Sequence, residues 1–578
     1  MKNVLKYLKN YKFKAIMAPI FKMLEACFEL MVPLVMASII DNGIKFGDKG
    51  YVLKMSVVLV LLGVIGLACA ITAQYFSAKT AMGFGKELRR DLFKHIESLS
   101  YTEIDELGSS TLINRMTTDV NQIQTGVNMF LRLFMRSPFI VFGATIMAFT
   151  VDAHTAKIFL VTLPALFLVV FGIMLISIPL FKKVQSKLDF VLLKTRENLS
   201  GARVIRAFSQ EENEMKEFGE ATNLLTKEQI FVGRISSFLN PLTYAIISLS
   251  MVVIIWVGSK QVDMGILKQG QVYAVVNYMS QILIELIKLA NLIITETKAV
   301  ACANRVASIF NVSNSLDYKT ERVIEKNNAP KVQFVNAGLT YKNAKESSIE
   351  GVNLTVNKGQ VIGIIGGTGS GKSSFVNLIS RFYDCTSGKV LIDGIDVKDY
   401  PKEQLIEKIG VVPQKACLFQ GTIEDNVRWG KQDATMEEID VALDIAQAKA
   451  FVNEKENGVK YMLNQGAKNL SGGQKQRLTI ARALVKKPEI LILDDSSSAL
   501  DYATDAALRV GIREKTKDMT VFVVSQRTSS IMHADQIVVL DDGLVAGVGS
   551  HDELLKNCEV YQEIYASQNK EEVATNER

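Results

Sequence analysis

The glycine-rich stretch at residues 366–373 restricts the possible folds of this chain more than any other feature. It consists of Gly366, Gly367, Thr368, Gly369, Ser370, Gly371, Lys372 and Ser373. A largely β-branched apolar run precedes it at 361–365, and an apolar helical pattern follows it from Phe375. Strand, glycine-rich loop and helix in this order fit the phosphate-binding pattern G-x-x-x-x-G-K-[ST]. An ordinary glycine-rich turn is the alternative, and it would not need this strand and helix.

Each residue type in the loop has a chemical role. Glycines let backbone N–H groups turn toward phosphate oxygens, and the helix start adds the positive end of its dipole. Lys372 supplies a mobile cation for the β- and γ-phosphates, and Ser373 offers a hydroxyl to Mg²⁺. We therefore expect a nucleotide with Mg²⁺ at this loop.

The first half of the chain is too apolar for a soluble domain. Hydrophobic residues make up 48% of the 578 residues, and the excess lies in six stretches long enough to approach or span a bilayer. These stretches are 15–40, 52–78, 136–151, 158–181, 238–257 and 272–294. The lysine-rich, acid-free start predicts a cytoplasmic N-terminus, and six spans return the chain to that side. The mild net charge of +6 does not indicate a nucleic-acid partner.

The segments between the spans are uneven in length. Those at 41–51, 152–157 and 258–271 are short, whereas those at 79–135 and 182–237 are long and polar with helical character. We expect membrane helices that continue into the cytoplasm. A polar stretch then separates the two halves, so the sequence predicts a transmembrane domain at 1–312, a linker at 313–330 and a nucleotide-binding domain at 331–578.

Charged residues inside the first span have two interpretations. Lys22, Glu25 and Glu29 are spaced three and four apart, so they share a helical face. Glu25 and Glu29 could face a water-filled cavity and receive cationic or polar cargo. Alternatively, Lys22 and Glu25 form a pair that holds helices together or sits in the membrane interface. Two arginines at the cytoplasmic start of the third span, Arg132 and Arg136, are interpreted as snorkelling side chains.

The second half carries further motifs around the phosphate-binding loop. Tyr341 follows a strand and could stack on adenine, and Gln414 follows another strand and could reach Mg²⁺ or water. Asp494 ends the buried strand 490–494, where it is placed to hold Mg²⁺, and Asp495 is at the position of a general base. Each of these residues alone has an ordinary packing or surface interpretation.

A second anion site is predicted about 100 residues after the first. It consists of Leu470, Ser471, Gly472, Gly473 and Gln474 before a helix that starts at Lys475. Serine and glycines at a helix start bind anions. This site suits a nucleotide held by a second copy of the domain better than the nucleotide of its own chain.

Together these residues resemble the ATP-binding cassette (ABC) superfamily. The matching motifs are the A-loop Tyr341, Walker A at 366–373 with Ser374 after it, the Q-loop Gln414, the signature 470–474, Walker B at 490–494 and a D-loop with Asp501. The resemblance implies an α-helical membrane domain of six spans with long cytoplasmic extensions, fused to an α/β P-loop nucleotide-binding domain. It implies ATP and Mg²⁺ as ligands, with Ser373, Gln414 and Asp494 on the metal, and two chains that sandwich two ATPs.

Two positions depart from the family pattern. The residue after the Walker B aspartate is usually Glu and is Asp495 here, and the switch residue is usually His and is Gln526 here. Asp is shorter than Glu by about 1.5 Å, and a misplacement of about 1 Å can cost on the order of a hundredfold in rate. Gln does not titrate near neutrality. We expect tight ATP binding with poor hydrolysis.

These departures predict a heterodimer in the plasma membrane with both termini cytoplasmic. This chain would hold the degenerate site and lend Ser471 and Gly473 to a competent site on a different half-transporter. The predicted activity is ATP-driven export of amphipathic or drug-like small molecules. Asp495 occupies the position of the general base and Gln526 that of the switch residue, and we expect both to support catalysis only weakly. A homodimeric drug or lipid exporter and an ATP-gated channel or regulatory subunit are the alternatives.

Overall fold

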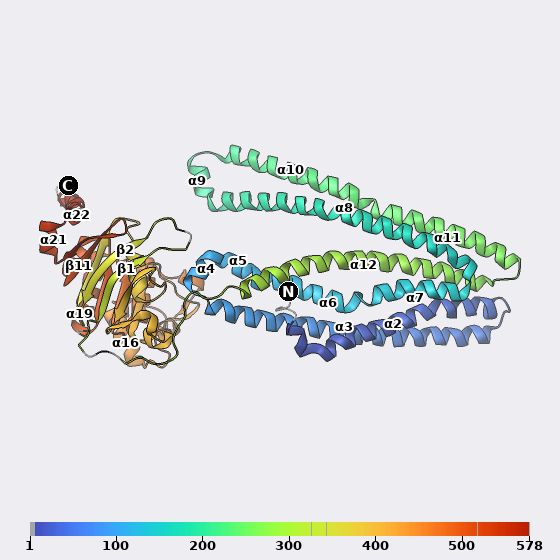
Figure 1. The fold of residues 1–578 in the computed structure, drawn as a ribbon, viewed down its shortest axis with the longest axis horizontal. Coiled ribbons are helices and arrows are strands. Elements are labelled where there is room, and N and C mark those ends of the chain that lie inside the picture. Colours follow the sequence, from blue (N-terminus) through green and yellow to red (C-terminus); the bar gives the residue numbers. More distant parts are fainter. Residues whose placement is uncertain (1–5, 325, 327, 343, 517, 577–578) are drawn as a thin grey trace. The chain divides into compact units, whose positions relative to one another are not determined.

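The computed structural model describes residues 6–324, 326, 328–342, 344–516 and 518–576, with side chains described as far as residue 568 (Figure 1). Lys2 of the basic start and positions 325 and 327 of the predicted linker lie outside the described residues. The chain divides into two compact units. One is drawn from Met1–Glu97 with Ser109–Val312, and the other from Ser98–Gly108 with Ser313–Arg578.

The described residues of the first unit form helices joined by short turns, without a strand. Six helical segments are long and apolar enough to cross a membrane, namely Lys6–Ile44, Lys49–Ser98, Ser109–Val151, Ala153–Ser200, Glu211–Asp263 and Gln269–Phe310. Their elements are η1 (Lys6–Tyr11), α2 (Lys12–Ser38), η2 (Ile39–Ile44), α3 (Lys49–Ser98), α5 (Ser109–Asn114), η3 (Arg115–Asp119), α6 (Val120–Leu133), α7 (Arg136–Val151), α8 (Ala153–Ser200), α9 (Ala202–Ala207), α10 (Glu211–Ser237), α11 (Leu239–Asp263) and α12 (Gln269–Phe310). The predicted six-helix domain is confirmed.

The long polar segments are helical as well. Helices α3 and α8 continue past their apolar parts to Ser98 and Ser200, and α10 leads into α11 (Figure 1). Helix α8 packs along α10 and α11, while α12 packs against α2, α6, α7 and α11. A core of buried apolar side chains, including Phe159, Tyr278 and Ile282, joins these helices. Burial of such side chains against one another is what orders the bundle.

The described residues of the second unit form three sheets. Their strands are β1 (Val332–Leu339), β2 (Ile349–Val356), β3 (Val361–Gly366), β4 (Ser387–Ile392), β5 (Ile395–Asp396), β6 (Ile409–Val412), β7 (Gly421–Thr422), β8 (Met462–Leu463), β9 (Ile490–Asp494), β10 (Thr520–Val524), β11 (Gln536–Asp541) and β12 (Leu544–Gly549). The antiparallel sheet has the order β2-β1-β4-β5, and the large sheet has the order β12-β11-β3-β10-β9-β6. In the large sheet only β12 runs antiparallel to its neighbour.

Helices cover the large sheet, and its central strands are buried along nearly their whole length. Near-continuous apolar runs are expected for parallel strands covered on both faces. The helices of this unit are α4 (Tyr101–Leu107), α13 (Lys372–Ile379), α14 (Lys402–Lys408), α15 (Ile423–Arg428), α16 (Met436–Ile445), α17 (Lys449–Asn453), α18 (Gly472–Leu484), α19 (Tyr502–Lys515), α20 (Thr528–Ile531), α21 (His551–Asn557) and α22 (Glu559–Asn576). Its described residues also form three short 3₁₀ turns, η4 (Val397–Asp399), η5 (Gly458–Lys460) and η6 (Gln465–Ala467).

Helix α4 belongs to the second unit although it precedes most of the first in sequence. The Tyr101 ring lies 4.7 Å from that of Phe382, centroid to centroid. Tyr383 donates a hydrogen bond from its hydroxyl to Asp105 Oδ2 at 2.6 Å, and Lys342 pairs with Glu106 at 2.6 Å. An aromatic contact flanked by polar bonds therefore fixes this short helix, which is too short to be stable alone.

Candidate functional site

The topology of the large sheet gathers the predicted nucleotide-binding residues at one edge. Strands β3, β10, β9 and β6 are consecutive parallel neighbours, so their carboxyl ends point the same way. The loop at 366–373 follows β3, Gln526 follows β10, Asp494 and Asp495 end β9, and Gln414 follows β6. In open parallel sheets, ligands bind beyond the carboxyl ends of the strands.

The backbone of the loop explains its glycines. Gly369 and Gly371 have φ values of +88° and +93°, in the left-handed region that other residues avoid. A Cβ on Gly366 would collide with the carbonyl oxygen of Leu540, and one on Gly371 with that of Ser348. Thr368 at the loop tip is exposed. The loop is therefore a tight backbone cradle at the start of helix α13.

Lys372 folds back into this cradle. Its ammonium group donates to the carbonyl oxygens of Gly366 at 3.0 Å and Gly367 at 2.5 Å. Burial lowers the pKa of Lys372, while the negative charges of Asp495 and Asp494 oppose this effect. The cradle thus combines backbone N–H groups, a helix start and a buried cation, which is the donor set that a polyphosphate requires.

Two oxygen ligands suited to Mg²⁺ lie beside the cradle. The Ser373 hydroxyl donates to Asp494 Oδ1 at 3.1 Å. Burial raises the pKa of Asp494, the Asp495 charge raises it further, and the Ser373 bond and the Lys372 charge oppose the rise. A hydroxyl and a carboxylate are hard oxygen donors, so these residues fit a magnesium ion bound together with phosphate. Such an ion would neutralise phosphate charge.

Asp495 and Gln414 meet at this edge. Gln414 donates from Nε2 to Asp495 Oδ2 at 3.3 Å, near the long limit of a hydrogen bond. Asp495 has a φ of +44° and is 7% exposed. Burial raises the pKa of Asp495, whereas the Gln414 bond and the charges of Lys372 and Arg527 lower it. The residue at the general-base position is therefore a buried, strained carboxylate with one side-chain partner.

The switch position has a partner that sequence reasoning missed. The Gln526 side chain is exposed, and among the described residues it makes no hydrogen bond to Asp495. Its backbone carbonyl accepts from Gln568 Nε2 at 2.7 Å, and Gln568 Oε1 accepts from the Thr528 N–H at 2.8 Å. Gln568 on α22 thereby holds the switch loop on both sides of Arg527. No sequence pattern pointed to this glutamine.

Tyr341 lies next to helix α13. Its hydroxyl is hydrogen-bonded to that of Ser374 at 2.9 Å, and its ring meets that of Tyr383 edge-on at 4.9 Å between centroids. Tyr341 is half-buried, and stacking of an adenine base on its ring stays a prediction. Tyr383 in turn is the aromatic residue that holds Asp105 of α4.

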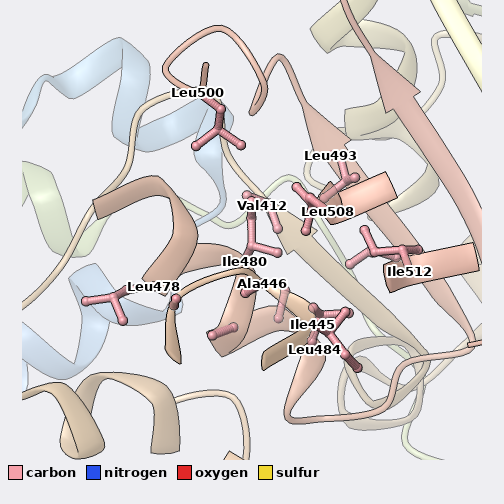
Figure 2. Packing of buried hydrophobic residues seen from close by; sticks show 14 of the residues in the cluster. Val412, Ile445, Ala446, Leu478, Ile480, Leu484, Leu493, Leu500, Leu508 and Ile512 are labelled. Atoms are coloured by element: carbon pink, nitrogen blue, oxygen red, sulfur yellow. The ribbon is translucent and has the colours of Figure 1, made fainter. Parts of the chain in front are cut away.

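The predicted signature forms the start of α18 and is directed to solvent. Ser471 Oγ accepts from the Gln474 N–H at 3.3 Å, and Gln474 Oε1 accepts from the Ser471 N–H at 3.1 Å. Ser471 and Gly472 are exposed, Gly473 is half-buried, and Leu470 is buried. Figure 2 shows apolar side chains from α18, β9 and α19 packed against one another, which fixes this helix. Asp501 caps α19 by accepting from the Thr504 N–H at 2.8 Å.

In the membrane unit, the first-span charges pair with other side chains and border a cavity, and cargo contact stays a prediction. Lys22 pairs with Glu25 at 2.6 Å, as the pairing hypothesis expects. Glu25 and Glu29 also line a cavity of about 500 Å³ together with Arg136. The snorkelling interpretation of Arg136 is wrong, because the residue is 7% exposed and pairs with Glu285 at 2.6 Å and Glu29 at 2.6 Å. Its partners lie on other helices, so sequence spacing could not reveal them.

Comparisons with known families identify both units. The profile of the ABC transporter transmembrane region matches residues 15–286, and the ABC transporter profile matches residues 349–498. An uncharacterised ABC transporter ATP-binding protein of Mycobacterium tuberculosis is 36% identical over 568 residues, covering 97% of each chain. A Bacillus subtilis protein named provisionally as a multidrug export ATP-binding/permease protein is 31% identical, covering 98% of this chain and 99% of its own.

A solved structure shares the fold. It is the structure of a bacterial Atm1-family ABC exporter with ATP bound, with a TM-score of 0.79 and 23% sequence identity. The match covers 96% of this chain and 98% of the other. The arrangement of six membrane-length helices followed by a nucleotide-binding fold is therefore shared over nearly the whole length.

Proposed function

This chain belongs to the ABC transporter family, and on that premise we propose that it exports amphipathic or drug-like small molecules. The family establishes ATP-driven transport coupled to an ATPase, and its exporters work as dimers. The observation that carries the proposal is the fusion, in one chain, of six membrane-length helices to an edge that gathers a phosphate cradle and two magnesium ligands. A relative named for multidrug export supports the choice of cargo class.

We further propose that the nucleotide site of this chain binds ATP tightly and hydrolyses it slowly. Asp495 is one C–C bond shorter than the usual glutamate, and its carboxylate accepts from Gln414 only at 3.3 Å. The Gln526 side chain is exposed, and an amide does not titrate at neutral pH. The cation of Lys372, the hydroxyl of Ser373 and the carboxylate of Asp494, which serve binding, are all present at the cradle.

The intact signature supports a heterodimer. Ser471 and Gly472 are exposed at the start of α18, where they are accessible to a nucleotide on another chain. We propose that the partner is a second half-transporter with Glu and His at the two departing positions. This chain would then complete the partner's competent site, while the partner's signature completes the weak one. The complex would lie in the plasma membrane with the termini of this chain in the cytoplasm.

The test compares ATP turnover by this chain alone with turnover after co-purification with the half-transporter encoded beside it. We expect little turnover alone and full turnover with the partner. In the complex, changing the partner's Walker B glutamate to glutamine should abolish turnover, whereas Asp495→Asn should change it little. Typical turnover by the chain alone would refute the weak site and favour a homodimer.

A transport measurement separates a pump from a channel. In sealed vesicles with ATP outside, a pump accumulates an amphipathic dye against its gradient, and this accumulation stops when turnover stops. An ATP-gated channel would only equalise the dye across the membrane. Accumulation without hydrolysable ATP would refute export by this chain.

A further inference from the structure

A cavity opens between α2, α3 and α7 in the membrane unit. Its volume is about 500 Å³. Its apolar wall includes Phe28, Val32, Leu59, Leu62, Gly63 and Gly66. Its polar wall consists of Glu25, Glu29 and Arg136. The combination of apolar walls and a small group of charged side chains is that of a site for a small organic molecule.

The polar wall belongs to a larger charge cluster that joins three helices. Arg136 on α7 pairs with Glu29 on α2 and with Glu285 on α12, each at 2.6 Å. Glu285 also accepts from Lys288 at 2.8 Å, and Lys22 pairs with Glu25 at 2.6 Å. The cluster as a whole is neutral. Charged side chains in membrane helices are costly unless paired, so they tend to mark functional sites.

The part of the cluster that faces the cavity is negative. Two carboxylates and one guanidinium line the wall, whereas Lys22, Glu285 and Lys288 do not. Glu29 is the most accessible of the three, with a side chain that is 42% exposed against 17% for Glu25 and 8% for Arg136. Its Oε2 is bonded to Arg136, and among the described residues its Oε1 has no hydrogen bond.

A third carboxylate, that of Glu25, lies near Arg136. Its Nε is buried and makes no hydrogen bond among the described residues, and it lies 4.0 Å from Glu25 Oε1. A cation that binds Glu29 would weaken one of the pairs of Arg136. Because Glu25 is close to the unbonded Nε, a small movement lets Arg136 exchange one carboxylate for the other. The exchange leaves no buried charge unpaired, which would otherwise be costly.

We propose that this cavity binds the cargo and that it selects amphipathic organic cations. The protonated amine of the cargo donates to Glu29, and its apolar body lies against Phe28, Leu59 and Leu62. Arg136 positions Glu29 and does not itself contact the cargo. This inference rests on the proposed export function and adds the class of cargo and the residue that recognises its head.

The test measures equilibrium binding to the purified full-length complex without ATP, using three fluorescent probes. They are dansylcadaverine, its neutral N-acetylated analogue and an anionic dansyl-aminocaproate, which share a dye and an alkyl chain. We expect the amine to bind roughly 10-fold tighter than the neutral analogue, as for one hydrogen bond to a charged group. Equal binding of the three probes, or tighter binding of the anion, would overturn the proposal.

Two variants locate the site, and one serves as a control. Glu29→Gln should remove the preference for the amine, and binding of the neutral analogue should stay unchanged. Gly63→Leu should weaken both probes, because a side chain added there meets open space in the cavity wall. Glu220→Gln removes an exposed carboxylate on α10, outside the cavity, and should change nothing. An unchanged amine preference in Glu29→Gln refutes the role of Glu29.

The binding result and the export result can fail separately. If the amine binds selectively but is not accumulated in vesicles, the site stands and the export function fails. If dyes are accumulated without any difference between the amine and its neutral analogue, export stands and the site fails. Loss of ATP turnover in Gly63→Leu would indicate misfolding of that variant. The proposal is then judged from Glu29→Gln alone, by comparing its binding of the amine with its binding of the neutral analogue.

Discussion

Restoring the two departing residues should raise ATP turnover at the site of this chain. In Asp495→Glu the carboxylate extends by one C–C bond, about 1.5 Å farther from β9. The present carboxylate accepts from Gln414 only at 3.3 Å, near the long limit of a hydrogen bond. A group misplaced by about 1 Å costs on the order of a hundredfold, or about 2.7 kcal/mol of activation free energy. Adding Gln526→His should raise the rate of ATP hydrolysis by roughly another 10²-fold, because an imidazole can transfer protons near neutral pH.

The measurement must isolate one site of the dimer. The complex is prepared with the partner's Walker B glutamate changed to glutamine, so that turnover reports only the site holding Asp495. We expect the double variant to exceed the parent by roughly 10²- to 10⁴-fold, with each single variant between them. Binding of a fluorescent ATP analogue serves as a folding control. Unchanged turnover with intact binding would refute the geometric account, and so would a hundredfold loss on Asp495→Asn.

Three further predictions concern the loop, the switch and the metal ligands. Gly371→Ala should abolish ATP binding, because φ is +93° there and the added Cβ would collide with the carbonyl oxygen of Ser348. At Gly367 an added Cβ meets open space, so Gly367→Ala should bind ATP normally. A titration with the fluorescent ATP analogue measures both. In the complex whose partner site is inactivated, Gln568→Ala should reduce the remaining turnover several-fold without affecting ATP affinity, since it frees the switch loop. Gln562→Ala on the same helix should leave that turnover unchanged. Burial raises the pKa of Asp494, so its carboxylate is protonated at a higher pH than that of an ordinary aspartate. Calorimetry should therefore show the affinity for Mg²⁺–ATP falling as the pH is lowered from 7. An affinity that stays constant down to about pH 4 would contradict this.

The parts of the nucleotide site that could be predicted from sequence are those encoded locally. Residues 366–373 bring the cradle, its lysine and its hydroxyl together in one turn. Asp494 was predictable because a buried strand carries it to its tip, and parallel neighbours bring that tip to the cradle. The six membrane helices were predictable because length and hydropathy alone decide them.

The remaining features depend on tertiary packing between distant segments. In the sequence, Arg136 has the position of a side chain at the end of a span. Its ion pair with Glu285 forms only because α12 packs beside it in the fold. Gln568 is an unremarkable residue near the end of the chain until α22 packs beside the switch loop. No pattern in the surrounding residues distinguishes either of them. The Lys22–Glu25 pair, by contrast, was predictable because its partners lie three residues apart on one helix.

The position of α4 in the second unit has a consequence for biosynthesis. The ribosome makes Tyr101 before it makes Phe382 and Tyr383, with the rest of the membrane unit in between. During synthesis, helix α4 therefore lacks its aromatic contacts until the last third of the chain has left the ribosome. A fragment beginning at Ser313 would lack α4 and expose these two rings to water. Soluble production of the ATPase half should consequently benefit from a short peptide spanning residues 98–108 supplied in trans.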